Sequence, residues 1–266
     1  MEKQQVREKI EEKNYQLLID VAVRAGELLL KSGSETHRIE DTVCYILQMA
    51  KLSTVEVLVI ATGFVVTLSD PTISPLTITK RIHQRAGNLS MIHEVNRISR
   101  SYCSGQMTLQ EAWLALEECE QRVDYAPWVV WVASLCTSTF FALLLGGNVI
   151  EILCAFLCGV TLMGIRLLFR KIRTNRFCQD LIASLGISFV AYCLNFLFQQ
   201  RGEMELIIAS SIMPLLPGMI FTTAVRDILH GDYLSGCSRM LEAVVIALGV
   251  AVGVGAGIGL FRLLFR

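Results

Sequence analysis

Residues 149–169 read VIEILCAFLCGVTLMGIRLLF, an apolar run with only two charged side chains, Glu151 and Arg166. An α-helix rises about 1.5 Å per residue, so roughly 20 such residues cross the ~30 Å hydrocarbon layer of a membrane. The run is therefore long enough and apolar enough to be a transmembrane helix. Similar runs predict four further spans, at 127–145, 181–198, 206–225 and 241–264.

The composition agrees with a membrane protein. Of the 266 residues, 53% are hydrophobic and 18% are charged, and the formal net charge is zero. A soluble domain carries roughly 25% charged residues, so the composition excludes a disordered chain and gives no sign of nucleic-acid binding. The nine cysteines contain no CxxC pair, which favours reduced core residues over a disulfide framework.

Residues 1–126 have a different character, with more acidic than basic side chains. Helical spacing of apolar residues predicts helices at 14–31, 34–50, 88–103 and 108–121, and alternation predicts strands at 55–60, 64–68 and 76–82. The opening MEKQQVREKIEEKN is too charged for a signal peptide. We therefore predict a small cytoplasmic α+β domain (1–126) that precedes a membrane α-helical bundle of about five transmembrane helices (127–266).

Positive charges in short loops indicate which side of the membrane faces the cytoplasm. The loops after the second and fourth predicted spans contain Arg166, Arg170, Lys171, Arg173, Arg176, Arg226 and Arg239. The other side carries only Arg201, Arg262 and Arg266. This asymmetry predicts a multi-pass protein of the cytoplasmic membrane with its N-terminus in the cytoplasm.

The fourth predicted span contains Pro214, Pro217 and Gly218 near its middle. Proline removes a backbone donor, and a broken helix persists in lipid only where protein or a water-filled cavity satisfies the freed groups. One interpretation is a substrate pathway lined by polar side chains of this and the preceding span, namely Asn195, Ser210, Ser211 and Thr222. The other is a packing kink, with Asn195 in a contact between helices.

The stretch RDILHGDYLSGCSR follows the fourth span and places Asp227 and Asp232 at its edge. Carboxylates in such positions can carry protons or bind a cation. Asp227 is therefore our candidate for coupling or gating of transport. The alternative is structural: Asp227 could pair with a loop arginine, and Asp232 could cap the next helix.

The fifth predicted span has Gly249, Gly253 and Gly257 on one helical face. Small residues let another helix approach closely. The partner is either another helix of the same chain or a second copy, so a homo-oligomer is one possibility.

A dense polar cluster lies at the start of the second predicted helix and contains Glu35, His37, Arg38, Glu40 and Asp41. His37 and Glu40 could share a metal, but two ligands are too few, and acidic residues suit a first helical turn in any case. We predict no metal and no cofactor. Lys80, Arg81 and Arg85 form a basic patch near Asn88 that could bind an anion or be an ordinary solvated surface.

Nothing in the chain indicates catalysis by a familiar motif, because it has no GxSxG, no P-loop and no GxGxxG after a strand. We therefore predict that the protein is not an enzyme.

Five segments carry a resemblance to a known family. They are RAGELLLKSGSETHRIEDT at 24–42, VEVLVIATGFVVTL at 55–68, TKRIHQRAGNL at 79–89, VNRISR at 95–100 and LLPGMIFTTAVRDILHGDYLSG at 215–236. With these, the chain resembles the threonine/serine exporter (ThrE-like) family, and is most similar to its short, YjjP-type members. The resemblance marks the following residues of the N-terminal domain as motif candidates: Gly33, Glu35, Thr36, Arg38, Glu40, Arg81, Arg85 and Asn88.

The resemblance implies an exporter of small polar metabolites, with threonine and serine or a dicarboxylate such as succinate as substrates. Short members of the family pair with a second small membrane protein that resembles the C-terminal half of the full-length members. Two other hypotheses remain at this point. One is a structural or sensory membrane protein whose cytoplasmic domain recruits a partner, and the other is a membrane-tethered hydrolase that uses Glu35, His37 and Glu40.

Overall fold

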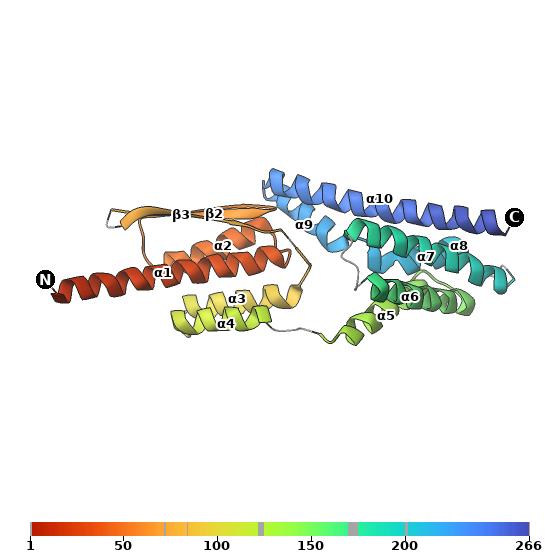
Figure 1. The fold of residues 1–266 in the computed structure, drawn as a ribbon, viewed down its shortest axis with the longest axis horizontal. Coiled ribbons are helices and arrows are strands. Elements are labelled where there is room, and N and C mark those ends of the chain that lie inside the picture. The colour runs from red at the N-terminus through yellow and green to blue at the C-terminus, as the bar shows by residue number, and fades with distance from the viewer. Residues whose placement is uncertain are drawn as a thin grey trace. The chain divides into compact units, whose positions relative to one another are not determined.

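A computed structural model describes residues 2–71, 73–83, 85–121, 125–169, 175–199 and 202–265 (Figure 1). The chain divides into two compact units. Unit 1 consists of Met1–Asp124 together with Met219–Met240, and unit 2 consists of Tyr125–Gly218 together with Leu241–Arg266. The segment 219–240 therefore belongs with the N-terminal residues, although it begins inside the fourth apolar run of the sequence.

Unit 1 is built on four helices that precede the membrane runs. They are α1 (Glu2–Lys31), α2 (Thr36–Gln48), α3 (Leu89–Cys103) and α4 (Leu109–Gln121). Thr108 accepts from the Glu111 amide and Glu111 accepts from the Thr108 amide at 2.7 Å, which is the capping box that starts α4. The model therefore contains the four helices that the sequence predicts in this region.

A three-stranded antiparallel sheet completes unit 1. Strands β1 (Thr54–Ile60), β2 (Gly63–Asp70) and β3 (Ile73–Arg81) lie in the order β1-β2-β3. Val66 of β2 is paired with Val57 of β1 on one side and with Ile78 of β3 on the other. Apolar side chains from α1, α2, α3, α4 and β2 form the core, and Phe64 is among its largest fully buried members.

Gly33 ends α1 and directs the chain into α2. Its φ of +78° lies in the left-handed region that glycine adopts without strain. The amides of Gly33 and Ser34 donate to the carbonyls of Leu30 and Leu29 at 3.2 and 3.1 Å, which satisfies the end of α1. The tight turn sets Glu35 and Thr36 at the start of α2.

Unit 2 is a helical bundle. It contains α5 (Pro127–Leu144), α6 (Val149–Phe169), α7 (Arg176–Leu197), α8 (Met204–Ile212), the short 3-10 helix η1 (Met213–Leu215) and the C-terminal part of α10 (Tyr233–Leu264). Its core includes Cys158, Leu162, Ile187 and Ile207. Among the described residues, four helices are long and apolar enough to cross a membrane, or five if a bent pair forms one span. The predicted fold class is confirmed.

The bent pair is the fourth predicted span. Met204–Leu215 and α9 (Gly218–Leu229) meet at an angle of 66°, with Pro217 between them. Two other predicted spans differ at their starts: α7 begins at Arg176 rather than 181, and α10 at Tyr233 rather than 241. Hydropathy marks only the apolar part of a helix, whereas the hydrogen-bonded helix continues into polar sequence.

The glycines of α10 face α7 of the same chain. A Cβ added at Gly249 would lie 2.8 Å from the ring of Phe177, and one at Gly253 or Gly257 would overlap Ser184 or Ser188. By contrast, a Cβ at Gly255 or Gly259 would meet nothing within 4 Å. The first face therefore packs within one chain, while a homo-oligomer stays a prediction.

Several residues on which the predicted orientation depends lie outside the described residues. They are Arg170, Lys171, Arg173, Arg201 and Arg266. The cytoplasmic placement of the N-terminus stays a prediction.

Candidate functional site

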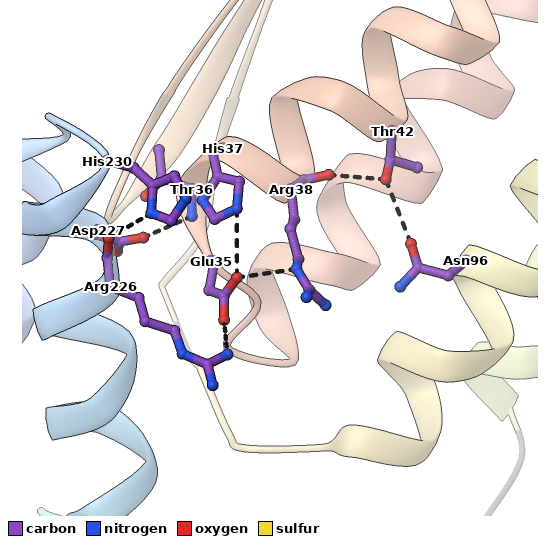
Figure 2. Close-up of polar contacts among 9 residues, drawn as sticks. All are labelled: Glu35, Thr36, His37, Arg38, Thr42, Asn96, Arg226, Asp227 and His230. Atoms are coloured by element: carbon purple, nitrogen blue, oxygen red, sulfur yellow. Dashed lines mark hydrogen bonds and ion pairs between the residues drawn. The ribbon is translucent and has the colours of Figure 1, made fainter.

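The candidate site lies in unit 1, where the start of α2 meets the end of α9 and the beginning of α10 (Figure 2). The first amides of a helix have no partner within it and need an acceptor from elsewhere. At α2 the residue before the helix, Glu35, makes no capping hydrogen bond. Instead, the Thr36 amide donates to Oδ1 of Asp227 at 2.9 Å, across 191 positions of sequence. A carboxylate at this end of a helix is also favoured by the helix dipole.

Glu35 is free to bind basic side chains because it does not cap α2. One oxygen accepts a hydrogen bond from Arg226 Nη1, and the other lies 3.0 Å from Arg38 Nε and 3.5 Å from His37 Nε2. Burial alone would raise the pKa of Glu35. The hydrogen bond from Arg226 and the charges of Arg38 and Arg226 outweigh burial, so the pKa lies below its ordinary value. Glu35 therefore stays ionised at neutral pH.

Asp227 is completely buried, with an exposed fraction of 0%. Its Oδ2 lies 3.3 Å from Nε of Arg239, which is itself 3% exposed, but this oxygen accepts no hydrogen bond from the described residues. The pairing with an arginine that the sequence left as an alternative is thus present in the structure. Whether Asp227 also couples or gates transport stays a prediction.

Two histidines lie beside this pair. The rings of His37 and His230 stack with centroids 3.9 Å apart, and Nδ1 of His230 is 2.9 Å from the carbonyl of Arg226. Asp232 follows in the turn between α9 and α10. Burial raises the pKa of Asp232, and the neighbouring Asp227 carboxylate adds to this effect. His37, Asp227 and Asp232 each offer one ligand atom, and these atoms lie within 4.8 Å of one another.

Glu40, the other residue considered for a metal, serves a different purpose. Its Oε1 accepts a hydrogen bond from the amide of Val59 at 2.8 Å and so joins α2 to β1. Burial raises the pKa of Glu40 more than this hydrogen bond lowers it. The metal-type cluster therefore forms around His37 with two residues of a distant segment rather than with Glu40.

The basic patch lies elsewhere in unit 1. Arg81 is exposed at the end of β3, and Asn88 caps α3 by accepting a hydrogen bond from the Met91 amide at 2.9 Å. Because the Asn88 side chain already satisfies this helix end, the geometry gives the predicted anion site no added support. Binding of an anion near Arg85 stays a prediction.

A groove of about 590 Å³ lies beside α3, and Arg38, Arg97 and Arg100 contribute to its lining. Two of these arginines already have acidic partners, since Arg38 pairs with Glu35 and Arg97 with Glu94. The groove therefore offers less free positive charge than its arginines suggest.

The polar residues proposed to line a substrate pathway belong to both units. In unit 2, Asn195 Oδ1 accepts from the Gly202 amide at 3.0 Å, and the hydroxyls of Ser210 and Ser211 donate to carbonyls of their own helix. In unit 1, the hydroxyl of Thr222 donates to the Met219 carbonyl. These polar groups all bond to the backbone of their own chain.

The break itself acquires a polar partner that the sequence reading missed. Arg166 of α6 donates from Nη2 to the carbonyl of Pro214 at 3.3 Å and from Nη1 to the Ser134 hydroxyl at 3.4 Å. The sequence reading counted Arg166 only as a loop charge. Its place one turn before the end of the apolar run was the available signal.

Comparison with known protein families covers most of the chain. Residues 20–261 match the family model ThrE, described as "Putative threonine/serine exporter". The chain belongs to the ThrE family. This membership, together with the apolar helices, shows a multi-pass membrane protein.

Curated relatives of this ThrE chain carry related names. It is 25% identical over 237 residues to the "Probable threonine/serine exporter" of Mycobacterium tuberculosis, covering 88% of this chain and 44% of the relative. It is 26% identical to the "Threonine/serine exporter" of Corynebacterium glutamicum, covering 88% of this chain and 49% of the relative. A "Pheromone-regulated membrane protein 10" of Zygosaccharomyces rouxii is 21% identical, with 83% and 23% covered.

The chain thus spans about half the length of the two bacterial relatives. No solved structure matches it.

Proposed function

We propose that this chain is a subunit of a secondary exporter that moves a small polar metabolite out of the cell across the cytoplasmic membrane. The support is its membership of the ThrE family and the names of its two bacterial relatives. Threonine and serine are the first substrates to test, and a dicarboxylate such as succinate is the second. We include a second small membrane protein in the proposal, as the similarity to short members of the family implies.

The broken fourth span is the observation that carries the proposal. Between α8 and α9 the Leu216 amide donates to the Met213 carbonyl and the Gly218 amide donates to the Leu216 carbonyl, in place of regular helical hydrogen bonds. Transporters commonly place their substrate site at such a break, where exposed backbone groups face a cavity rather than lipid. We therefore assign the substrate pathway to the neighbourhood of Pro214 and Pro217.

Arg166 provides the charge that this pathway needs. Threonine, serine and succinate all carry a carboxylate, and a guanidinium matches a carboxylate with two parallel hydrogen bonds. Arg166 contacts the Pro214 carbonyl at the break and is otherwise exposed on the chain. In this mechanism Arg166 exchanges the carbonyl for the substrate carboxylate as the substrate enters.

We assign gating to Asp227. It holds the first turn of α2 to α9 through the Thr36 amide, so a movement of α9 would break that contact. The proton gradient is our proposed driving force.

Efflux from preloaded cells tests the function directly. Cells that express this chain with a candidate partner protein are loaded with labelled threonine, serine or succinate, and release is followed with time. We expect release of one of these that an empty vector does not give. No release, with both proteins detected in the membrane, would contradict the exporter assignment and favour a protein that recruits a partner.

A proline pair tests the role of the break. Pro214→Ala with Pro217→Ala restores two backbone donors and should straighten the span, so efflux should fall while the protein remains in the membrane. Pro127→Ala is the matched control, because Pro127 sits in the first turn of α5, where proline is tolerated. Undiminished efflux from the double variant would remove the break from the mechanism.

A further inference from the structure

We propose that His37, Asp227 and Asp232 bind a divalent transition-metal ion, of which Zn²⁺ is the best match and Mn²⁺ the second. Their ligand atoms lie within 4.8 Å of one another. Ligands that share one Zn²⁺ at about 2.0–2.2 Å lie roughly 3–4 Å apart. Small rotations of the three side chains are therefore enough to close the set around an ion.

The surroundings of His37 support this inference independently. Its Nε2 faces the Glu35 carboxylate at 3.5 Å, while Nδ1 is buried and has no hydrogen-bond partner among the described residues. Histidines that bind metals almost always donate their second ring N–H to a carboxylate or carbonyl. Glu35 occupies the position of this outer carboxylate, and we assign Nδ1 as the ring nitrogen that binds the ion.

Asp227 contributes a second, separate observation. One oxygen is used by the Thr36 amide, and the other, Oδ2, accepts no hydrogen bond although the residue is 0% exposed. Burying a carboxylate oxygen that accepts no hydrogen bond costs free energy. Arg239 stands 3.3 Å away and forms an ion pair with Oδ2. A metal ion bound to Oδ2 would complete its coordination.

The kinds of ligand atom also favour a cation. Asp227 and Asp232 offer carboxylate oxygens, and His37 offers a ring nitrogen. One histidine nitrogen and two carboxylates form a mixed donor set that suits Zn²⁺ or Mn²⁺ better than Ca²⁺, which prefers oxygen alone.

Such an ion would fasten the start of α2 to the turn between α9 and α10, all within unit 1. It would thereby stabilise the same contact that Asp227 makes with Thr36. The inference rests on these contacts and does not depend on the exporter function.

The test uses the full chain, purified in detergent, stripped with EDTA and titrated with ZnCl₂ or MnCl₂. We expect one bound ion per chain by mass spectrometry and a higher thermal midpoint with the ion than with EDTA. His37→Gln and Asp232→Asn should each weaken binding at least tenfold, and Glu35→Gln about 10–100-fold, as for other outer-shell partners. His83→Gln is the matched control, since His83 is an exposed histidine outside the candidate cluster.

Two results would overturn the proposal. One is the absence of a stoichiometric ion and of any thermal shift in the unmodified chain. The other is binding that neither His37→Gln nor Asp232→Asn weakens, or that His83→Gln weakens just as much, because the ion would then lie elsewhere. The titration of the unmodified chain decides the matter even where a variant fails to fold.

Discussion

Two buried carboxylates show how differently the two units use charge. Glu151 of unit 2 is 4% exposed, and its two oxygens accept the amides of Asn148 and Glu203 at 2.7 Å each. Asp227 of unit 1 is 0% exposed, yet it uses only one oxygen for a backbone amide. Glu151 is thus fully satisfied and holds a loop in place, whereas the second oxygen of Asp227 accepts no hydrogen bond from the described residues and lies in an ion pair with Arg239.

The same contrast extends to the neighbouring side chains. Around Asp227 the contacts are ionic and aromatic, through Arg239, Glu35 and the stacked histidines. In the bundle, serine hydroxyls bond to backbone carbonyls, and glycines allow α10 to approach α7. Function that depends on charge is therefore expected in unit 1 and at Arg166, while most polar groups of the bundle stabilise it.

The largest effect is expected from Asp227→Asn. The buried Arg239 would lose its counter-charge, and removing one partner of a buried pair costs about 3–5 kcal/mol. We expect efflux to fall at least tenfold in preloaded cells while protein is still found in the membrane.

A double variant separates charge from folding. Asp227→Asn with Arg239→Gln removes both charges and should recover much of the lost stability. Efflux that stays low shows that the carboxylate itself is needed. Efflux that returns would leave Asp227 a structural role and remove it from gating.

Gly253→Ala should give the next largest effect. Its Cβ would overlap Ser184 and the Leu181 carbonyl, so α10 must move away from α7, at about 1–3 kcal/mol. Gly255→Ala is the control, because a Cβ there meets nothing within 4 Å. The thermal midpoint in detergent should fall only for Gly253→Ala. Equal effects at the two positions would show that this packing does not limit stability.

Glu151→Gln should destabilise the bundle by less. The amide group of glutamine has one oxygen, so either Asn148 N or Glu203 N loses its acceptor, at about 1–3 kcal/mol. The thermal midpoint should fall and efflux per folded protein should be unchanged. Loss of efflux in a protein of normal stability would place the α7–α8 loop in the transport pathway.

Glu27→Gln should have the smallest effect, and one that depends on pH. Burial alone raises the pKa of Glu27, but the hydrogen bond and charge of Lys31, with Arg24, lower it below the ordinary 4.5. A carboxylate whose pKa is lower in the folded state than in the unfolded chain stabilises the fold when the pH is above the unfolded-state pKa. This contribution is lost as the pH falls through the lowered pKa of the folded state.

The measurement is thermal unfolding of Glu27→Gln beside the unmodified chain. At pH 7 the variant should be less stable by under about 1 kcal/mol, since the ion pairs are only partly buried. As the pH falls below 4.5, the difference should shrink towards zero. A difference that does not change with pH would mean that packing, not charge, is responsible.

Much of the fold could be read from local sequence. The apolar run 149–169 coincides with α6, and the Thr108–Glu111 capping box marks the start of α4. Helix starts were harder, as at α7 and α10, because polar residues continue a helix that hydropathy no longer marks.

The candidate site was only half visible. Glu35 and His37 stood out because they are close in sequence, and Asp227 because it follows the prolines. The metal hypothesis was set aside because only His37 and Glu40 were counted. The other two donors, Asp227 and Asp232, lie some 190 positions away, and no local pattern predicts such a contact.

By itself, then, the sequence determined a helical membrane protein with an N-terminal α+β region and one broken span. Hydrophobic burial and proline chemistry act locally, so these features are written in short stretches. Only the tertiary structure decided that 219–240 packs with the N-terminal residues and that Asp227 caps α2. The first amide of α2 needs an acceptor and the buried Arg239 is favoured by a nearby negative charge, and folding brings the Asp227 carboxylate to both.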